Sequence, residues 1–182
     1  MSEPGDRDRP GDADDSSGVH DALARFATGV VLLAAHDEED GDAVFTATSF
    51  TSVSHEPPLV LVGVTTGGWM HEVLDRTPEW AVSVLAESHR ALAARFAAPQ
   101  RPSPRILLTG VPHRHGEAAG ALVLDGAVAV LECRTERQVE AGDHVLLLGR
   151  VLAARTPVPH LRPLLRLDHR YTVPRTEGEP RP

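Results

Sequence analysis

The chain of 182 residues lacks lysine, has a single cysteine, Cys133, and contains no apolar run of membrane-spanning length. All 18 basic residues are arginines. Without lysine, the protein cannot use a Schiff base, a lysine nucleophile or a Walker-type phosphate lysine. Arginine, backbone N–H groups or hydroxyls must therefore hold any anion. One cysteine excludes an internal disulfide framework and a thiolate zinc cluster, and it indicates a reducing compartment. We expect a cytoplasmic protein.

Positive charge is scarce as well. The chain carries 26 acidic residues and a formal net charge of −8, which argues against a broad surface for nucleic acid or anionic membrane. Residues 1–18 hold six acids against two arginines and almost no apolar side chain, so we predict a disordered acidic arm there. We predict that residues 174–182 form a flexible tail. The intervening residues, 19–173, have the length of a single domain.

Common nucleotide and hydrolase motifs are also missing. Gly63, Gly67 and Gly68 have the wrong spacing for G-x-G-x-x-G. A nicotinamide nucleotide, if used, therefore does not bind in a Rossmann crevice. Neither a G-x-S-x-G nucleophile elbow nor an H-E-x-x-H motif occurs. The sequence gives no support to a hydrolase of either type.

The remaining histidine and cysteine signals are weak. His113 and His115 flank Arg114, but Glu117 is the only nearby acid at a convincing ligand spacing. We interpret this stretch as a surface loop and predict no metal site. Cys133 lies in an apolar run, which favours an inert thiol in the core.

Hydrophobic periodicity predicts a mainly β protein. Short apolar runs between turn signals predict strands over 30–35, 43–49, 59–64, 80–85, 127–136, 144–153 and 164–167. Helical spacing predicts helices over 19–27, 69–75 and 87–97. Most strands form hairpins and do not alternate regularly with helices. The pattern therefore favours an antiparallel barrel with a few peripheral α-helices over a doubly wound parallel sheet. Residues 99–126 receive no assignment.

Two segments carry polar groups suited to chemistry. The stretch 46–58 (TATSFTSVSHEPP) holds six hydroxyl residues where a strand passes into a loop. Such hydroxyls and backbone N–H groups can hold a planar heterocycle and a phosphate, but an ordinary strand edge has the same composition. The second segment, 141–144 (AGDH), joins two long strands. It either presents Asp143 and His144 at a barrel rim or is a hairpin whose histidine faces solvent.

Taken in order, several segments resemble the short-chain NAD(P)H:flavin oxidoreductases, the flavin reductase components of two-component flavin-dependent monooxygenases. The resemblance covers about 19–173. The segments that carry it are 26–31 (FATGVV), 46–54 (TATSFTSVS), 57–62 (PPLVLV), 81–85 (AVSVL), 92–97 (LAARFA), 131–133 (LEC), 140–144 (EAGDH) and 149–151 (GRV).

The resemblance implies an antiparallel Greek-key split β-barrel that binds FMN or FAD, usually as a homodimer with the flavin near the subunit interface. It assigns flavin binding to Thr46, Ala47, Thr48, Ser49, Phe50, Thr51, Ser52 and Val53, with Gly67, Gly68 and Arg95 near the phosphate. It places Phe26, Ala27, Thr28, Gly29, His144, His169, Arg170 and Tyr171 on the NAD(P)H side. Hydride transfer requires nicotinamide C4 held against flavin N5, so no catalytic acid or base is expected. We assign His144 to orienting the nicotinamide and Tyr171 to covering the site.

The chain departs from the family pattern at two places. Relatives often carry serine and threonine in the loop that follows the third strand, where this chain has Gly67, Gly68, Trp69 and Met70. Backbone N–H groups of the two glycines, or Arg95, must then hold the phosphate. Trp69 either stacks on a flavin or adenine ring or packs against the barrel. The segment 99–110 also lacks the aromatic residues often present there.

The implied function is an NAD(P)H-dependent flavin reductase that supplies reduced flavin to a partner monooxygenase. Two alternatives share the same barrel: a flavin-binding or haem-related binding protein without catalysis, and an FMN-dependent oxidase that is reduced by its own substrate.

Overall fold

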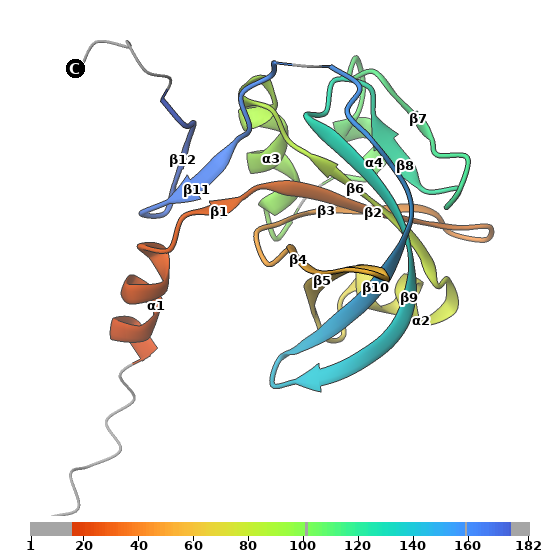
Figure 1. Cartoon of the computed structure of the whole chain (residues 1–182), viewed down its shortest axis with the longest axis horizontal. Helices are drawn as coiled ribbons and strands as arrows, with labels where there is room; N and C mark the ends of the chain where they lie inside the picture. Colours follow the sequence, from red (N-terminus) through yellow and green to blue (C-terminus); the bar gives the residue numbers. More distant parts are fainter. Residues whose placement is uncertain (1–15, 101, 159, 176–182) are drawn as a thin grey trace, which may run out of the picture.

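The apolar runs between turns form an antiparallel sheet of seven strands in a computed structural model that describes residues 16–100, 102–158 and 160–175. The order across this main sheet is β3-β2-β6-β9-β10-β5-β4 (Figure 1), and β3 and β4 at its two edges leave the barrel open. Its strands are β2 (Val31–Asp37), β3 (Gly41–Ala47), β4 (Thr51–His55), β5 (Pro58–Thr65), β6 (Glu79–Val84), β9 (Ala129–Ala141) and β10 (His144–Arg155).

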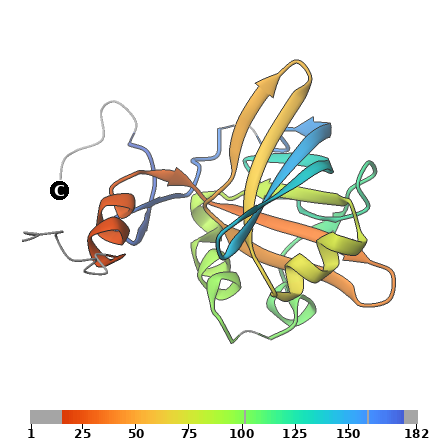
Figure 2. The same cartoon turned by 90° about the horizontal axis from the view of Figure 1, so that it is seen from below.

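Two smaller sheets flank the main one. β1 (Thr28–Gly29), β11 (Leu165–Leu167) and β12 (Arg170–Thr172) form the first, which we call the small sheet. β7 (His113–His115) and β8 (Leu122–Leu124) form the second. The helices are α1 (Ser16–Ala24), α2 (Trp69–Arg76), α3 (Arg90–Ala97) and the short α4 (Pro104–Leu107), with a 3-10 turn η1 (Glu87–His89) before α3. In both views α1 and the small sheet lie to one side of the main sheet (Figures 1 and 2).

The core lies on both faces of the main sheet, and β2 divides it. Leu32 and Ala34 belong to the cluster that packs under α3, α4 and β8. Val31 and Leu33 belong to the cluster inside the barrel with β5, α2 and Trp80. Because successive residues of a strand point to opposite faces, a strand buried on both sides reads as a continuous apolar run. This explains the run at 30–35.

Trp80 in β6 is fully buried, and its indole Nε1 donates to Thr135 Oγ1 of the neighbouring strand β9 at 3.0 Å. The indole lies directly against Gly149 in β10, where a Cβ atom would overlap the ring. The glycine of the 149–151 motif therefore leaves room for a tryptophan two strands away in the sheet.

The structure confirms the mainly β class, and it corrects several element boundaries. The helix predicted over 19–27 ends at Ala24, the strand predicted over 43–49 ends at Ala47, and the helix predicted over 87–97 begins as the 3-10 turn η1. β4 was not predicted, because its hydroxyl-rich residues carry no apolar alternation. The unassigned segment 99–126 contains α4, β7 and β8, so His113 and His115 lie on a strand and not in a loop.

Cys133 is fully buried, and burial raises the pKa of its thiol to about 12, as the predicted inert core position requires. No helix among the described residues is both long and apolar enough to cross a membrane. The predicted acidic arm and tail lie largely outside the described residues, and α1 begins at Ser16.

Candidate functional site

A cavity of about 680 Å³ opens where β3, the end of β5, the start of α2 and the end of α3 meet. This volume is within the range of small-molecule and cofactor sites. Its wall combines apolar and aromatic side chains with a few hydroxyls and two carboxylates. The lining residues are Asp40, Asp42, Val44, Phe45, Thr46, Val64, Thr65, Gly68, Trp69, Met70, Phe96, Ala97, Pro99, Pro102, Ser103 and Pro104.

Two of the predicted flavin-binding hydroxyls are engaged by the backbone. Thr46 Oγ1 donates to the carbonyl of Ala93 at 2.9 Å, which fixes β3 against α3. Ser49 Oγ donates to the Gly63 carbonyl at 2.9 Å and accepts from the Gly63 N–H at 3.1 Å. This pair of bonds fastens residues 48–50 to β5, outside the regular strand pairing. These two hydroxyls therefore hold the segment in place and are already paired with backbone groups.

The end of β5 and the start of β10 form a polar tip beside this cavity. His144 Nε2 lies 3.4 Å from Thr65 Oγ1, and Thr65 lines the cavity. On its other side, His144 Nδ1 lies 2.8 Å from Asp143 Oδ1, and the hydrogen bond from the imidazole lowers the pKa of the Asp143 carboxyl. Thr66 donates from both its N–H (3.0 Å) and its hydroxyl (3.1 Å) to the Asp143 carbonyl. The predicted rim position of Asp143 and His144 therefore has a defined geometry.

The start of α2 supplies backbone donors to the same cavity. Gly67 has φ +69°, a conformation that favours glycine, and it turns the chain from β5 into the helix. Gly68, Trp69 and Met70 line the cavity at the first helical turn, where N–H groups are free of intrahelical partners and the helix dipole favours an anion. Arg95 is exposed on α3, next to the lining residue Phe96.

Trp69, for which the sequence left two alternatives, lies at the wall of the main cavity. It lines the cavity with 43% of its surface exposed, and Arg76 lies 5.8 Å from its ring centroid. The ring is therefore partly exposed at the cavity wall and contacts Arg76, and its stacking on a ligand stays a prediction.

The other predicted NAD(P)H residues lie at the small sheet. Thr28 of β1 pairs with Arg166 of β11, which in turn pairs with Tyr171 of β12. The Arg166 guanidinium stands 5.0 Å over the Tyr171 ring, and Arg90 Nη1 donates to the Tyr171 carbonyl at 2.6 Å. Phe26, just before β1, is 73% exposed. A second cavity of about 470 Å³ is lined here by Leu167, Asp168, Arg170, Tyr171 and Thr172.

The predicted residues therefore fall into two groups. Of the predicted flavin residues, Thr46 and Gly68 line the main cavity, and Gly67 and Arg95 each directly precede a lining residue. Residues 47–53 do not line it, and Thr51–Val53 lie on β4 at the other edge of the main sheet from β3. Within the NAD(P)H set, His144 joins this cavity through Thr65, whereas residues 26–29 and 169–171 lie at the small sheet. Sequence reasoning missed the cavity walls Phe45, Met70 and Phe96. Only their periodic apolar spacing could have indicated them, and core residues show the same signal.

Comparison with known proteins gives a consistent result. A family model described as a flavin reductase like domain matches residues 23–174. The actinorhodin polyketide dimerase of Streptomyces coelicolor is 43% identical over 161 residues, which cover 88% of each chain.

Two solved structures extend this likeness. The NADH:FAD oxidoreductase of Streptomyces globisporus C-1027, solved with NAD and FAD fragments, has a TM-score of 0.83 and 32% identity, covering 94% of this chain and all of that one. The styrene monooxygenase flavin reductase of Pseudomonas putida S12 has a TM-score of 0.74 and 36% identity, covering 86% of this chain and 97% of that one.

Proposed function

Because the chain belongs to the flavin reductase like domain family, we propose that it uses NAD(P)H to reduce FMN or FAD. The family, the split-barrel class and the reductase activity that the ordered motifs predicted are confirmed by these relatives. The observation that carries the proposal for this chain is the main cavity. Thr46 of the hydroxyl-rich segment and Gly68 at the start of α2 line it, and His144 contacts its lining residue Thr65.

The residues present suit a flavin. Phe45, Met70 and Trp69 would give apolar and aromatic surface to the isoalloxazine ring. Backbone N–H groups of residues 48–50, which follow the lining residue Thr46, would donate to its polar edge. The N–H groups at the start of α2 and the Arg95 guanidinium hold the phosphate, as a chain without lysine requires. The backbone donors replace the missing serine and threonine of the loop.

When bound, the flavin supplies the electron chemistry by accepting a hydride at N5 from nicotinamide C4. The chain's own residues position the two partners. Backbone N–H groups of residues 48–50 stabilise the negative charge that develops at the pyrimidine edge. His144, held by Asp143 and Thr65, orients the nicotinamide at the cavity mouth. Hydride transfer needs neither a nucleophile nor a catalytic base, so we assign neither role.

We further infer a homodimer, in which the small sheet of one protomer covers the cavity of its partner. The exposed apolar side chains of α1 and its C-terminal end support this arrangement: Val19 is 60% exposed, Leu23 66% and Phe26 73%. Tyr171 then covers the site. We also propose that the reduced flavin passes to a partner monooxygenase. The use of NAD(P)H and the single buried cysteine support a cytoplasmic location.

An anaerobic assay tests the reaction. Purified protein mixed with NADH or NADPH and excess FMN or FAD should bleach the flavin absorbance in at least one combination. Flavin binding without nicotinamide oxidation would indicate the binding-protein alternative. Reduction by another small substrate and not by either nicotinamide would indicate the oxidase.

The variant His144→Ala tests the role of the polar tip. Because His144 touches Thr65 and Asp143 and no predicted phosphate donor, kcat/KM for the nicotinamide should fall about tenfold with flavin Kd unchanged. His55→Ala, on the exposed edge strand β4, is the matched control. Equal loss of flavin binding and nicotinamide use would contradict the orienting role.

A further inference from the structure

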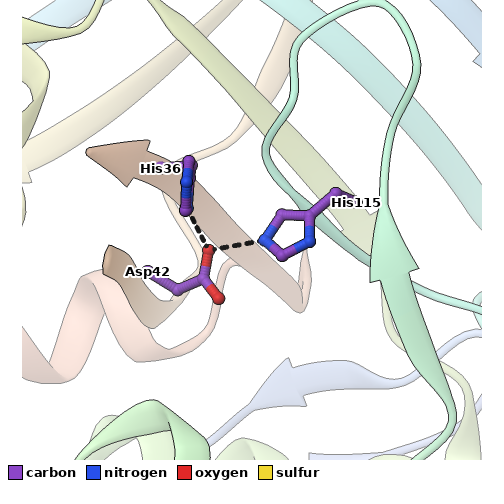
Figure 3. A group of neighbouring side chains, drawn as sticks. All are labelled: His36, Asp42 and His115. Carbon is purple, nitrogen blue, oxygen red and sulfur yellow. Dashed lines mark hydrogen bonds and ion pairs between the residues drawn. The ribbon is translucent and has the colours of Figure 1, made fainter. Parts of the chain in front are cut away.

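Two histidines and an aspartate converge at the edge of the main cavity, and the proposed flavin chemistry assigns no role to any of the three. His36 and Asp42 are directly opposite each other on β2 and β3, and His115 reaches them from β7 (Figure 3). Asp42 Oδ1 lies 2.9 Å from His36 Nδ1 and 2.9 Å from His115 Nε2. The two imidazole rings are 4.9 Å apart at an interplanar angle of 68°. Three potential ligand atoms therefore share one small volume.

The backbone that presents these side chains is held on both sides. In the turn between β2 and β3, Asp37 accepts the N–H groups of Glu39 and Asp40, each at 3.0 Å. Arg76 of α2 ties the same turn through Asp37 (3.1 Å) and Asp40 (2.8 Å). The pairing with Arg76 lowers the pKa of the Asp37 carboxyl. The turn is therefore anchored independently of the histidines.

β7 is anchored by its own partner. His115 pairs with Leu122 and His113 with Leu124, and both leucines of β8 are buried in the core. The Gly116 N–H also donates to the Ala121 carbonyl at 2.9 Å. Only the side chains themselves remain adjustable, since that of His36 is 39% exposed, that of Asp42 24% and that of His115 50%.

From this convergence we propose that His36, Asp42 and His115 bind a divalent first-row transition ion, with Zn²⁺ as the preferred probe. Two imidazole nitrogens and one carboxylate oxygen are a ligand set that zinc sites use, with a fourth position left to water. All three ligand atoms lie within 4.8 Å of one another. In a tetrahedral site with bonds of about 2.0–2.1 Å, the ligands are roughly 3.3 Å apart. Small rotations of these partly exposed side chains are enough.

Binding needs no change in the number of protons when both histidines are neutral. In the tautomer that donates to Asp42, each imidazole would move its proton to the other ring nitrogen, which leaves Nδ1 of His36 and Nε2 of His115 free to coordinate. The ion then replaces two N–H···O contacts to one carboxylate oxygen. Mg²⁺ and Ca²⁺, which require several oxygen ligands, should not bind this set.

The location gives the ion a structural consequence. Asp42 lines the main cavity and also a neighbouring cavity of about 640 Å³, which His113 lines as well. A bound ion would tie the β7–β8 sheet to the β2–β3 hairpin at the edge of both. No single stretch of sequence predicts this, because His115 is 73 residues away from Asp42. Our prediction of no metal site considered only the acid next to His115, Glu117.

Zinc competition tests the proposal. Untagged protein stripped with a chelator is titrated with Zn²⁺ against a chromophoric zinc indicator, and one ion per chain should bind with Kd of about 1 μM or tighter. His36→Gln and His115→Gln should each weaken binding about tenfold or more. Zn²⁺ should also raise the melting temperature of the wild type, and Mg²⁺ should not.

The matched control is His20→Gln. His20 also lies beside a second histidine, His169, at 4.7 Å between ring centroids, with Asp21 nearby, but these groups do not converge as ligands. The control should bind Zn²⁺ as the wild type does. Unchanged affinity in the double variant His36→Gln/His115→Gln, or equal loss in His20→Gln, would overturn the site. A wild-type protein that cannot compete with the indicator for Zn²⁺ would also overturn the site. Circular dichroism of each variant establishes that it is folded, and Co²⁺ absorbance intensity of the wild type reports the tetrahedral geometry.

Discussion

The main sheet and the small sheet are built in opposite ways. In the main sheet, β2, β6, β9, β10 and β5 each pair on both sides, and β2 is buried on both faces. The strands of the small sheet are two or three residues long, and none of their residues is buried, although Leu164 just before β11 is. Beside this sheet, Leu23 of α1 and Phe26, just after α1, are exposed. The main sheet therefore contains its own core, whereas large apolar side chains beside the small sheet are exposed.

The contacts that hold the small sheet lead to the same distinction. Arg25 and Asp168 form an ion pair at 3.1 Å with side chains 80% and 49% exposed, and such pairs contribute little stability. The firmer links are backbone bonds, from the Val30 N–H to the Leu164 carbonyl (3.1 Å) and from the Asp168 N–H to the Ala24 carbonyl (2.8 Å). Together with the bond from Arg90 to the Tyr171 carbonyl, these links join the small sheet to the rest of the fold.

The largest expected effect is on the free energy of unfolding, when one glycine in each sheet is replaced by alanine. Gly149→Ala forces a Cβ into the fully buried Trp80 indole, so the free energy of unfolding should fall by about 3 kcal/mol. Gly29→Ala in β1 meets nothing within 4 Å and should change it by less than about 1 kcal/mol. Urea unfolding followed by tryptophan fluorescence measures both. Equal losses would mean that the two sheets are packed alike.

A charge on α1 tests whether the small sheet completes its surface with a second copy. Leu23→Asp should convert the dimer to a monomer in sedimentation velocity, because the exposed leucine would bring a carboxylate into an apolar interface. NAD(P)H oxidation should fall about tenfold or more, with urea stability of the main sheet unchanged.

Leu152→Asp is the control for this variant, since Leu152 is 43% exposed on β10 and does not line the main cavity. It should remain dimeric. A Leu23→Asp protein that is still dimeric and active would remove α1 from the interface and leave the small sheet without a role in the site.

Predictability from sequence follows the same division. The apolar runs that became β2, β5, β6 and β10 carried a strong signal because burial on one or both faces constrains every residue. The small sheet carried almost none: β11 was expected to within one residue, but β1 and β12 are too short for any periodicity to appear. β4 was hidden for another reason, since its residues are mostly exposed and its pairing is irregular at Ser52 and Ser54.

The site shows a similar limit. The hydroxyl-rich segment and the AGDH turn were found from sequence, because residue types and order were enough to indicate them. What Thr46 and Ser49 do was not, since their partners, Ala93 and Gly63, are 47 and 14 residues away. The His36–Asp42–His115 cluster depends on three strands meeting, and only the fold brings them together.

The smallest expected effect concerns the joint between the two sheets, where His89 lies in η1. Its Nδ1 accepts the Ala86 N–H at 3.2 Å, and Ala86 bridges to Pro163 on the chain that enters the small sheet. Burial lowers the pKa of His89 below its usual value of 6.5. The unfolded chain therefore takes up the proton first, so stability is full above about pH 6.5 and falls as the pH drops toward the folded-state pKa.

Urea unfolding at about pH 7.5 and about pH 5.5 measures this loss. In His89→Gln, the side-chain carbonyl can still accept the Ala86 N–H but does not titrate, so the part of the acid loss due to His89 should disappear. His55→Gln, on the exposed strand β4, should keep the acid dependence of the wild type. If His89→Gln and the wild type lose the same stability on acidification, the joint is not sensitive to this histidine. The difference between the two sheets would then rest on packing alone.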